Sequence, residues 1–174
     1  LNQLVGTKVS IVSPKVQTTR RRIIGISMQR ATQILFVDTP GIFVPKKRLE
    51  RAMVQAAWSA AAEADICLFL VDARAGVTAL DEVLADMLRR EGAEVILVAN
   101  KAEGQAGSGG TWDAFGLGLG EPVALSAEHG EGMQDLYNRL RPMADAADEA
   151  AQAPQAEAET DIDHRAQAVE EVLH

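Results

Sequence analysis

The sequence predicts a three-layer α/β fold with a mainly parallel sheet, and three observations support this prediction. Short apolar segments alternate with segments of helical periodicity along the 174 residues. Hydrophobic residues make up 47% of the chain and aromatic residues only 4%, so a sizeable core must be aliphatic. The continuous apolar run at 66–72 is typical of a strand buried on both faces of a parallel sheet. The low aromatic content also argues against a stacking platform for single-stranded nucleic acid.

The expected elements follow from apolar periodicity and from the positions of Gly and Pro. The first residues resemble a helix end closed by Gly6, and Pro14 ends a short β-branched segment. Strands are expected at 21–28, 31–38, 66–72, 94–99 and 122–125. Helices are expected at 49–64, 80–88, 111–115 and 133–140. The glycine-rich segment 104–110 is expected to be a loop, and the last helix is expected to end near Pro142.

Charge is distributed unevenly, although the total is −8. Residues 1–51 carry +8, residues 52–143 carry −8 and residues 144–174 carry another −8. The composition predicts one α/β domain over 1–143, followed by an acidic, Ala-rich linker or tail over 144–174. An interaction segment is the alternative for the tail. Uneven charge of this kind indicates that different surfaces have different partners.

Several classes of protein are disfavoured. A single cysteine, Cys67, excludes a disulfide framework and a Cys-based zinc site. The three histidines lie far apart in the sequence and suggest no metal cluster. Nothing resembles a secretory signal peptide, and the longest apolar run is too short to cross a bilayer. We therefore expect a cytoplasmic protein.

Three short polar motifs each follow a predicted strand, and they carry the chemistry. They are Asp38-Thr39-Pro40-Gly41, Asn100-Lys101-Ala102-Glu103 and Ser126-Ala127-Glu128. In open parallel α/β sheets, ligands bind outside the carboxyl ends of the strands, so all three motifs are expected on one rim of the sheet. Taken singly, these residues have other interpretations. Asp38 could cap a turn and Asn100 could be a helix C-cap. Thr19, which lies outside the three motifs, could be an exposed loop residue.

The order of these motifs resembles that of the guanine-nucleotide-binding GTPases, which have a Ras-like P-loop fold. The resemblance implies that Asp38 serves the water shell of Mg²⁺, which keeps most of its waters and takes few protein ligands. It implies that the Gly41 N–H approaches the γ-phosphate, with Thr39 and Pro40 in the same motif. It also implies a switch threonine that closes over Mg²⁺, for which Thr19 fits and Thr18 is the second choice.

On the base side, the resemblance implies that Asn100 contacts the base edge and that the Lys101 stem lies over the base. The Glu103 carboxylate would accept two donors of guanine, a donor pair that adenine lacks. The Ala127 N–H would donate to the guanine carbonyl, within a closing loop that also includes Ser126 and Glu128. GTP or GDP with Mg²⁺ are therefore the expected cofactors.

The resemblance can be narrowed to the bacterial ribosome-assembly GTPases Era and Der, also called EngA. Era is resembled by two segments of the sequence, LVGTKVSIVSPKVQTTRRRIIGI and FVDTPGIFVPKKRLERAMVQAAW. From about residue 64 onward the sequence resembles the first GTPase domain of Der, and the acidic tail resembles the linker to Der's second domain. This change of resemblance from Era to Der along the sequence suggests a composite chain. The implied function is GTP hydrolysis as a switch in ribosome biogenesis.

The implied partner is rRNA or a ribosomal subunit. The basic segments 15–22 and 46–51 would contact RNA phosphates, unless they are an ordinary solvated basic face. We expect no DNA partner, and nothing in the sequence supports a peripheral membrane contact. An alternative function is a truncated, non-enzymatic module that binds rRNA or a protein. A dinucleotide enzyme is disfavoured because GxGxxG does not follow a first strand.

The sequence departs from the family pattern in four ways. The phosphate loop GxxxxGK(S/T) is absent, together with the first strand of the family fold, so we expect an N-terminally truncated domain with impaired hydrolysis. Without that strand, the strands ending at Asp38 and Asp72 would pair directly or leave buried backbone groups unsatisfied. Position 103 is Glu rather than the commoner Asp. Ile42 occupies the position of a water-positioning Gln, which implies slow turnover and activation by K⁺ or a partner. Within the 174 residues we expect neither a KH domain nor a second GTPase domain.

Overall fold

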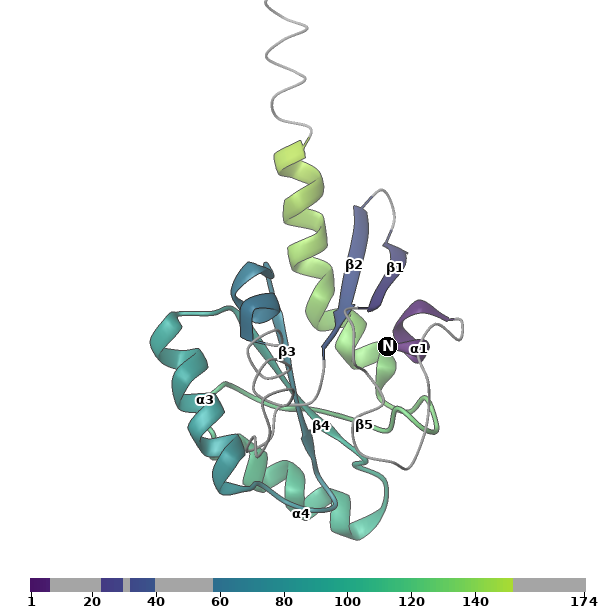
Figure 1. The fold of residues 1–174 in the computed structure, drawn as a ribbon. Helices are drawn as coiled ribbons and strands as arrows, with labels where there is room; N and C mark the ends of the chain where they lie inside the picture. The colour runs from purple at the N-terminus through teal and green to yellow at the C-terminus, as the bar shows by residue number, and fades with distance from the viewer. Residues whose placement is uncertain (7–22, 30–31, 40–57, 152–174) are drawn as a thin grey trace, which may run out of the picture.

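The computed structural model describes residues 1–6, 23–29, 32–39 and 58–151 (Figure 1). The β-branched segment 8–13 and most of the predicted helix at 49–64 lie outside these residues, although residues 58–63 are helical. The labelled elements are α1 (Asn2–Val5), β1 (Ile23–Gln29), β2 (Thr32–Asp38), β3 (Cys67–Asp72), α3 (Ala79–Glu91), β4 (Val95–Asn100), α4 (Gly104–Phe115) and β5 (Val123–Leu125). A further helix spans residues 133–151.

Strands β3, β4 and β5 form a parallel sheet in that order. The register places Asp72 opposite Asn100 and Asn100 opposite Leu125, so the three strands end together. Parallel strands buried on both faces have nearly continuous apolar sequences, and CLFLVD and VILVAN fit that rule. The predicted parallel sheet is therefore confirmed.

Strands β1 and β2 form a separate antiparallel hairpin, with Ile23 opposite Asp38 and Gln29 opposite Thr32. Among the described residues, β2 pairs with β1 alone and β3 pairs with β4 alone. Direct pairing of the strands that end at Asp38 and Asp72, one of the two expected outcomes, does not occur. The hairpin instead joins the rest of the molecule through side chains.

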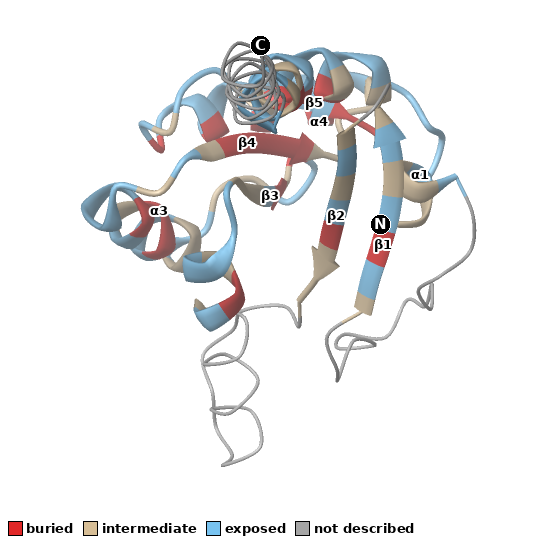
Figure 2. Ribbon diagram, turned by 90° about the horizontal axis from the view of Figure 1, so that it is seen from above, coloured by how far each residue is buried: buried red, intermediate tan, exposed pale blue. Residues whose placement is uncertain are grey.

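The core has two halves, one on each face of the parallel sheet (Figure 2). Alternation along β4 explains this division, because successive side chains of a strand point to opposite faces. Ile96 and Val98 belong to one cluster, whereas Leu97 and Ala99 belong to the other. The first cluster contains Phe36 of β2 and Leu136 and Leu140 of the 133–151 helix, with side chains of α1 packed against it. The second contains Ala85 of α3 and Ala114 of α4. Helices therefore cover both faces, as the three-layer prediction requires.

Helix α3 covers the expected segment 80–88 and extends beyond it at both ends, to Ala79 and Glu91. The Thr78 hydroxyl accepts a hydrogen bond from the Asp81 N–H, and the Asp81 carboxylate accepts one from the Thr78 N–H at 2.8 Å, which completes a capping box. Gly92 closes the helix in the left-handed conformation, with φ 67°. The helix therefore follows from local sequence.

The segment 104–110 is not a loop, contrary to expectation, because helix α4 begins at Gly104. Glycine disfavours helix formation, but two of these glycines allow close packing. A Cβ at Gly107 would collide with the backbone of Ala102, and a Cβ at Gly110 would collide with the carbonyl oxygen of Ala73. The expected helix at 111–115 is the second half of α4. Tertiary packing therefore overrides the local preference.

The last helix does not end near Pro142, contrary to expectation, because residues 133–151 are helical throughout. Proline inside a helix costs about 3 kcal/mol through a lost hydrogen bond and a steric clash. Contacts beyond the proline favour continuation. Ala144 is 7% exposed, and its carbonyl accepts a hydrogen bond from Thr32 Oγ1 at 3.0 Å. The helix therefore extends past residue 143, where the domain was expected to end, and residues 152–174 lie outside the described part.

Within the described residues, no helix combines the length and apolar character that a membrane span requires.

Candidate functional site

The candidate site is the rim formed by the carboxyl ends of β3, β4 and β5. Backbone hydrogen bonds join the three segments that leave these strands. The Ala73 N–H donates to the Asn100 carbonyl at 2.8 Å, and the Ala102 N–H donates to the Leu125 carbonyl at 3.1 Å. The rim is therefore a connected structure, and the motifs beginning at Asn100 and Ser126 lie side by side.

Asn100 connects two of the loops through its side chain. Its Oδ1 atom accepts hydrogen bonds from the N–H of Lys101 at 2.9 Å and from the N–H of Ala127 at 3.0 Å. The Ala127 N–H is the group expected to meet a guanine carbonyl. In this structure that N–H donates to Asn100, so an incoming carbonyl would have to share or replace this contact.

Lys101 has a left-handed backbone, with φ 61°, a conformation that costs a non-glycine residue about 1 kcal/mol or more. Its ammonium lies 2.5 Å from Asp72 Oδ2. Burial by itself would raise the pKa of the Asp72 carboxyl, but the hydrogen bond from Lys101, the N–H groups of Ala75 and Arg74 and the Lys101 charge together lower it. The lysine that was expected over a base therefore pairs with a carboxylate of the neighbouring loop.

Glu103 occupies the N-cap position of α4 but makes no capping hydrogen bond with its side chain. Its Oε1 atom lies 2.5 Å from Arg74 Nη2. Its Oε2 atom is buried and has no donor in hydrogen-bonding geometry among the described residues. The Glu103 backbone N–H, then the Ser126 hydroxyl, and less strongly the charges of Arg74 and His129, lower the pKa of this carboxyl. The result is a charged carboxylate that has polar hydrogens of Glu103 and Ser126 nearby, although its buried Oε2 atom has no donor in good hydrogen-bonding geometry among the described residues.

Ser126 holds the third loop in a tight turn and is 2% exposed. Its N–H donates to the Glu131 carbonyl at 2.9 Å, and its carbonyl accepts from the Gly130 N–H at 2.8 Å. Its hydroxyl accepts a weaker hydrogen bond from the His129 N–H at 3.4 Å. Glu128, in contrast, is exposed at the surface of the loop.

The first motif is placed differently from the other two. Asp38 and Thr39 are half-buried at the end of β2, in the hairpin that shares no strand pairing with the parallel sheet. Sheet register therefore does not bring Asp38 to the rim. The remaining predicted residues, Thr18, Thr19, Pro40 and Gly41, lie outside the described residues.

Two rim residues were missed by sequence reasoning. Asp72 ends β3 directly opposite Asn100, and Arg74 follows it in the next loop. The signal for Asp72 was present, because it ends a buried strand as Asp38 and Asn100 do. Nothing in the sequence indicated Arg74, since its contact with Glu103 spans 29 residues.

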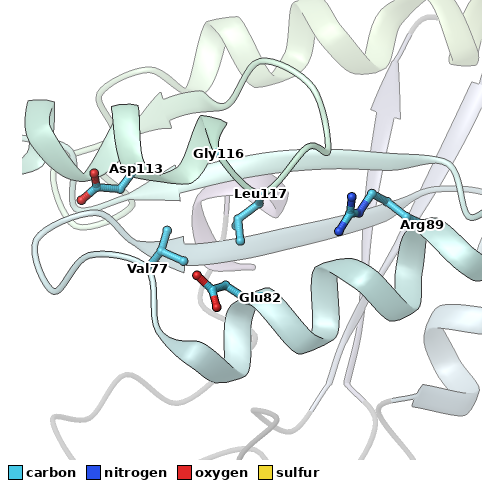
Figure 3. A pocket seen from close by; sticks show the side chains of 6 residues that line it. All are labelled: Val77, Glu82, Arg89, Asp113, Gly116 and Leu117. Atoms are coloured by element: carbon cyan, nitrogen blue, oxygen red, sulfur yellow. The ribbon is translucent and has the colours of Figure 1, made fainter.

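One described cavity lies away from the rim. A space of about 520 Å³ lies between α3 and α4, lined by Val77, Glu82, Arg89, Asp113, Gly116 and Leu117. Figure 3 shows Arg89 at one end of this space and Asp113 at the other. None of the predicted site residues lines it. Within the described part of the chain, no group of three or more His, Cys, Asp or Glu residues is arranged to hold a metal ion.

Comparisons with known proteins identify relatives of the whole chain. Residues 1–101 match the family model of the 50S ribosome-binding GTPases. The chain is 44% identical over 172 residues to the GTPase Der of Ruegeria pomeroyi, which covers 98% of this chain and 35% of that protein. It is 48% identical over 163 residues to the GTPase Der of Jannaschia sp., covering 93% of this chain and 33% of that protein. The chain thus spans about a third of the length of these curated relatives. One relative covers both the Era-like and the Der-like segments, so a composite origin is not needed to explain the match.

Solved structures agree with these relatives. A crystal structure of Era in complex with MgGDPNP and nucleotides 1506–1542 of 16S ribosomal RNA matches with a TM-score of 0.72 and 36% identity. The match covers 80% of this chain and 49% of that one. A structure of a probable GTP-binding protein, EngB, matches with a TM-score of 0.60 over 83% of this chain and 90% of that one; at 18% identity it shows the fold alone. The fold is therefore that of the P-loop GTPases, as the sequence predicted.

Proposed function

The chain belongs to the family of 50S ribosome-binding GTPases, and from this premise we propose that its rim binds the base of a guanine nucleotide, GDP or GTP. One observation carries the proposal. Glu103 presents a charged carboxylate with a buried acceptor atom that has no donor in the described residues, beside the loops of Asn100 and Ser126. A buried acceptor without a partner is costly; one donor of a guanine base would satisfy Oε2, and the adjacent donor of the base would share Oε1 with Arg74.

Each rim residue has a role in this proposal. Glu103 accepts the two donors of guanine, and adenine is rejected because it cannot supply both. Asn100 holds the Ala127 loop and, together with the Ala127 N–H, faces the base edge. Lys101 leaves Asp72 to lie along the base. Ser126 fixes the third loop, and Glu128 marks its exposed side.

We extend the proposal to the phosphates and to the metal. A carboxylate at a strand end, such as Asp38, would accept hydrogen bonds from the water molecules that Mg²⁺ keeps in its shell. Thr19, or Thr18 in its place, would be the second protein group for that ion. Mg²⁺ would neutralise charge on the phosphates, and the Gly41 N–H, in the motif with Thr39 and Pro40, would contact the γ-phosphate.

Hydrolysis of GTP is proposed from family membership. The 174 residues contain no GxxxxGK(S/T), the sequence that supplies the backbone cradle and the lysine for the phosphates. We therefore expect this chain to bind the base and to hydrolyse GTP slowly when studied by itself. Ile42 stands where a glutamine would orient water, so K⁺ or a partner is the proposed activator.

A role in ribosome assembly, in the cytoplasm, is proposed with rRNA or a ribosomal subunit as partner. The family description and the 16S ribosomal RNA bound in the Era structure support this proposed role. The basic segments 15–22 and 46–51 are the proposed RNA contacts, and such contacts weaken steeply with salt.

The first experiment measures binding of fluorescent GDP to the 174-residue chain, with GTP and ATP as competitors, with and without Mg²⁺. We expect competition by GTP and none by ATP. A folded chain that binds no guanine nucleotide would contradict the proposal. It would favour the alternative of a non-enzymatic module that binds rRNA or a protein.

Glu103→Gln is the decisive variant, because an amide replaces one acceptor by a donor. Binding of GDP should weaken by about 10- to 100-fold, whereas XDP, whose base carries an oxygen in place of the guanine amino group, should bind more tightly than to the wild type. Glu94→Gln is the matched control, since Glu94 is an exposed carboxylate at the opposite end of β4. An unchanged preference for GDP over XDP in Glu103→Gln would exclude Glu103 as the base-reading group.

A further inference from the structure

Arg74, in the loop that follows β3, contacts the carboxylate of Glu103. Among the described residues of that loop, no other side chain is seen to do so. Its Nη2 atom lies 2.5 Å from Glu103 Oε1, and the two side chains are 58% and 19% exposed. The contact joins two loops that are 29 residues apart in the chain. It therefore depends on the sheet that brings the ends of β3 and β4 together.

The position of Arg74 is fixed by Asp72. Asp72 Oδ1 accepts hydrogen bonds from the N–H of Arg74 at 3.0 Å and from the N–H of Ala75 at 3.1 Å, and its carbonyl accepts from the Gly76 N–H at 3.0 Å. Its other carboxylate oxygen holds Lys101. Aspartate turns of this kind fix the backbone that follows them. The Arg74 side chain therefore leaves a fixed turn in the direction of Glu103.

Glu103 is a residue whose orientation needs such support. It carries one methylene more than aspartate, and its side chain does not cap the helix that begins beside it. A carboxylate has about four acceptor positions, so the contact from Arg74 does not use up the acceptors of Glu103 even with the Ser126 hydroxyl nearby. Arg74 contacts Oε1, whereas Oε2 is the buried atom without a donor. The arginine thus holds Oε1, and a ligand donor would reach Oε2 by displacing the groups that cover it.

We infer that Arg74 is a positioning residue for base recognition: it fixes the Glu103 carboxylate in the orientation that accepts the two donors of a guanine base. This inference rests on the proposed function. It identifies Arg74 as the group that makes the long side chain of Glu103 selective for guanine. Arg74 acts through Glu103 and not by contact with the nucleotide.

The test compares GDP affinity in the wild-type chain, Arg74→Ala, Arg74→Lys and the control Arg90→Ala. Arg90 is an exposed arginine paired with Asp86 on α3. Because Arg74 is more than half exposed, we expect Arg74→Ala to raise the Kd for GDP by about three- to tenfold. The GDP-over-XDP preference should fall as well, a change that a purely structural role would not produce. Arg74→Lys should restore most of the affinity, since the observed contact uses one donor.

A second comparison tests whether Arg74 affects GDP binding through Glu103. In a Glu103→Asp background the shorter acid needs no anchor, so Arg74→Ala should change the Kd by less than about twofold. An equal loss of affinity in both backgrounds would overturn the inference. Unchanged GDP binding by Arg74→Ala would overturn it too. Tighter GDP binding by Arg74→Ala would also overturn it, because it would show that the arginine competes with the base for Glu103. In either case wild-type binding of GDP would leave the proposed function standing. A folded wild-type chain without GDP binding would overturn both.

Discussion

At the scale of single residues, Asp72 organises the rim. One carboxylate oxygen holds the Arg74 turn, and the other pairs with Lys101 at 2.5 Å. Asn100 performs the corresponding task on the next strand, where its Oδ1 atom accepts from the Lys101 and Ala127 N–H groups. Two short polar side chains at opposed positions of β3 and β4 therefore fix three loops before any ligand arrives.

The lowered pKa values of Asp72 and Glu103 predict how stability depends on pH. Their ordinary values are 3.8 and 4.5, and both are lower in the folded chain. As the pH falls, the unfolded chain therefore binds protons first, so the stabilisation is present above these ordinary values and is lost below them.

Urea unfolding of the wild type and of Asp72→Asn between about pH 7 and pH 3 measures this dependence. The wild type should lose stability on acidification more steeply than Asp72→Asn. Asp86→Asn, which removes a half-exposed carboxylate of α3 far from the rim motifs in sequence, serves as the control. Identical pH profiles for the wild type and Asp72→Asn would contradict the prediction.

At the scale of elements, α4 shows how a helix forms from a sequence with poor helical preference. Its first seven residues include four glycines, and those at positions 107 and 110 permit close contact with the segments that leave β4 and β3. Close packing of the helix onto the rim requires these absent side chains. The same contacts place Glu103 at the start of the helix.

Two adjacent glycines of α4 give a matched prediction. Gly109 is exposed, and a Cβ there would meet nothing within 4 Å, so Gly109→Ala should stabilise the chain by about 0.5–1 kcal/mol. Gly110 is buried against the Ala73 carbonyl, so Gly110→Ala should destabilise it by roughly 1–3 kcal/mol. Thermal unfolding measures both. Stabilisation by both substitutions would show that α4 does not pack closely on the rim.

At the scale of the whole molecule, the hairpin and the parallel sheet are joined by side chains and not by strand pairing. Phe36 contributes to the cluster that includes Val98 and Leu136, and Thr32 donates to the carbonyl of Ala144. β4, in contrast, is paired on both sides and contributes to both clusters. The two sheets thus differ in how firmly they are held.

Hydrogen exchange should reveal this difference. Amides of β1 and β2 should exchange through a local opening that costs less than global unfolding, whereas amides of β4 should exchange only on global unfolding. Phe36→Ala should increase exchange in the hairpin more than in β4, because Phe36 is the one buried hydrophobic side chain that the described hairpin adds to the core. Equal protection of β1, β2 and β4 would show that the molecule opens as one unit.

The sequence by itself determined the α/β class, the order of the strands along the chain, helix α3 and the polar motifs at the ends of β4 and β5. These features depend on local patterns: apolar runs, a capping box and the rule that ligands bind at strand ends. Only the tertiary structure decided that α4 begins at Gly104, that the last helix passes Pro142, that β2 and β3 do not pair, and that Arg74 meets Glu103. Each of these depends on contacts between residues far apart in the chain, and such contacts outweigh a local preference of a few kcal/mol.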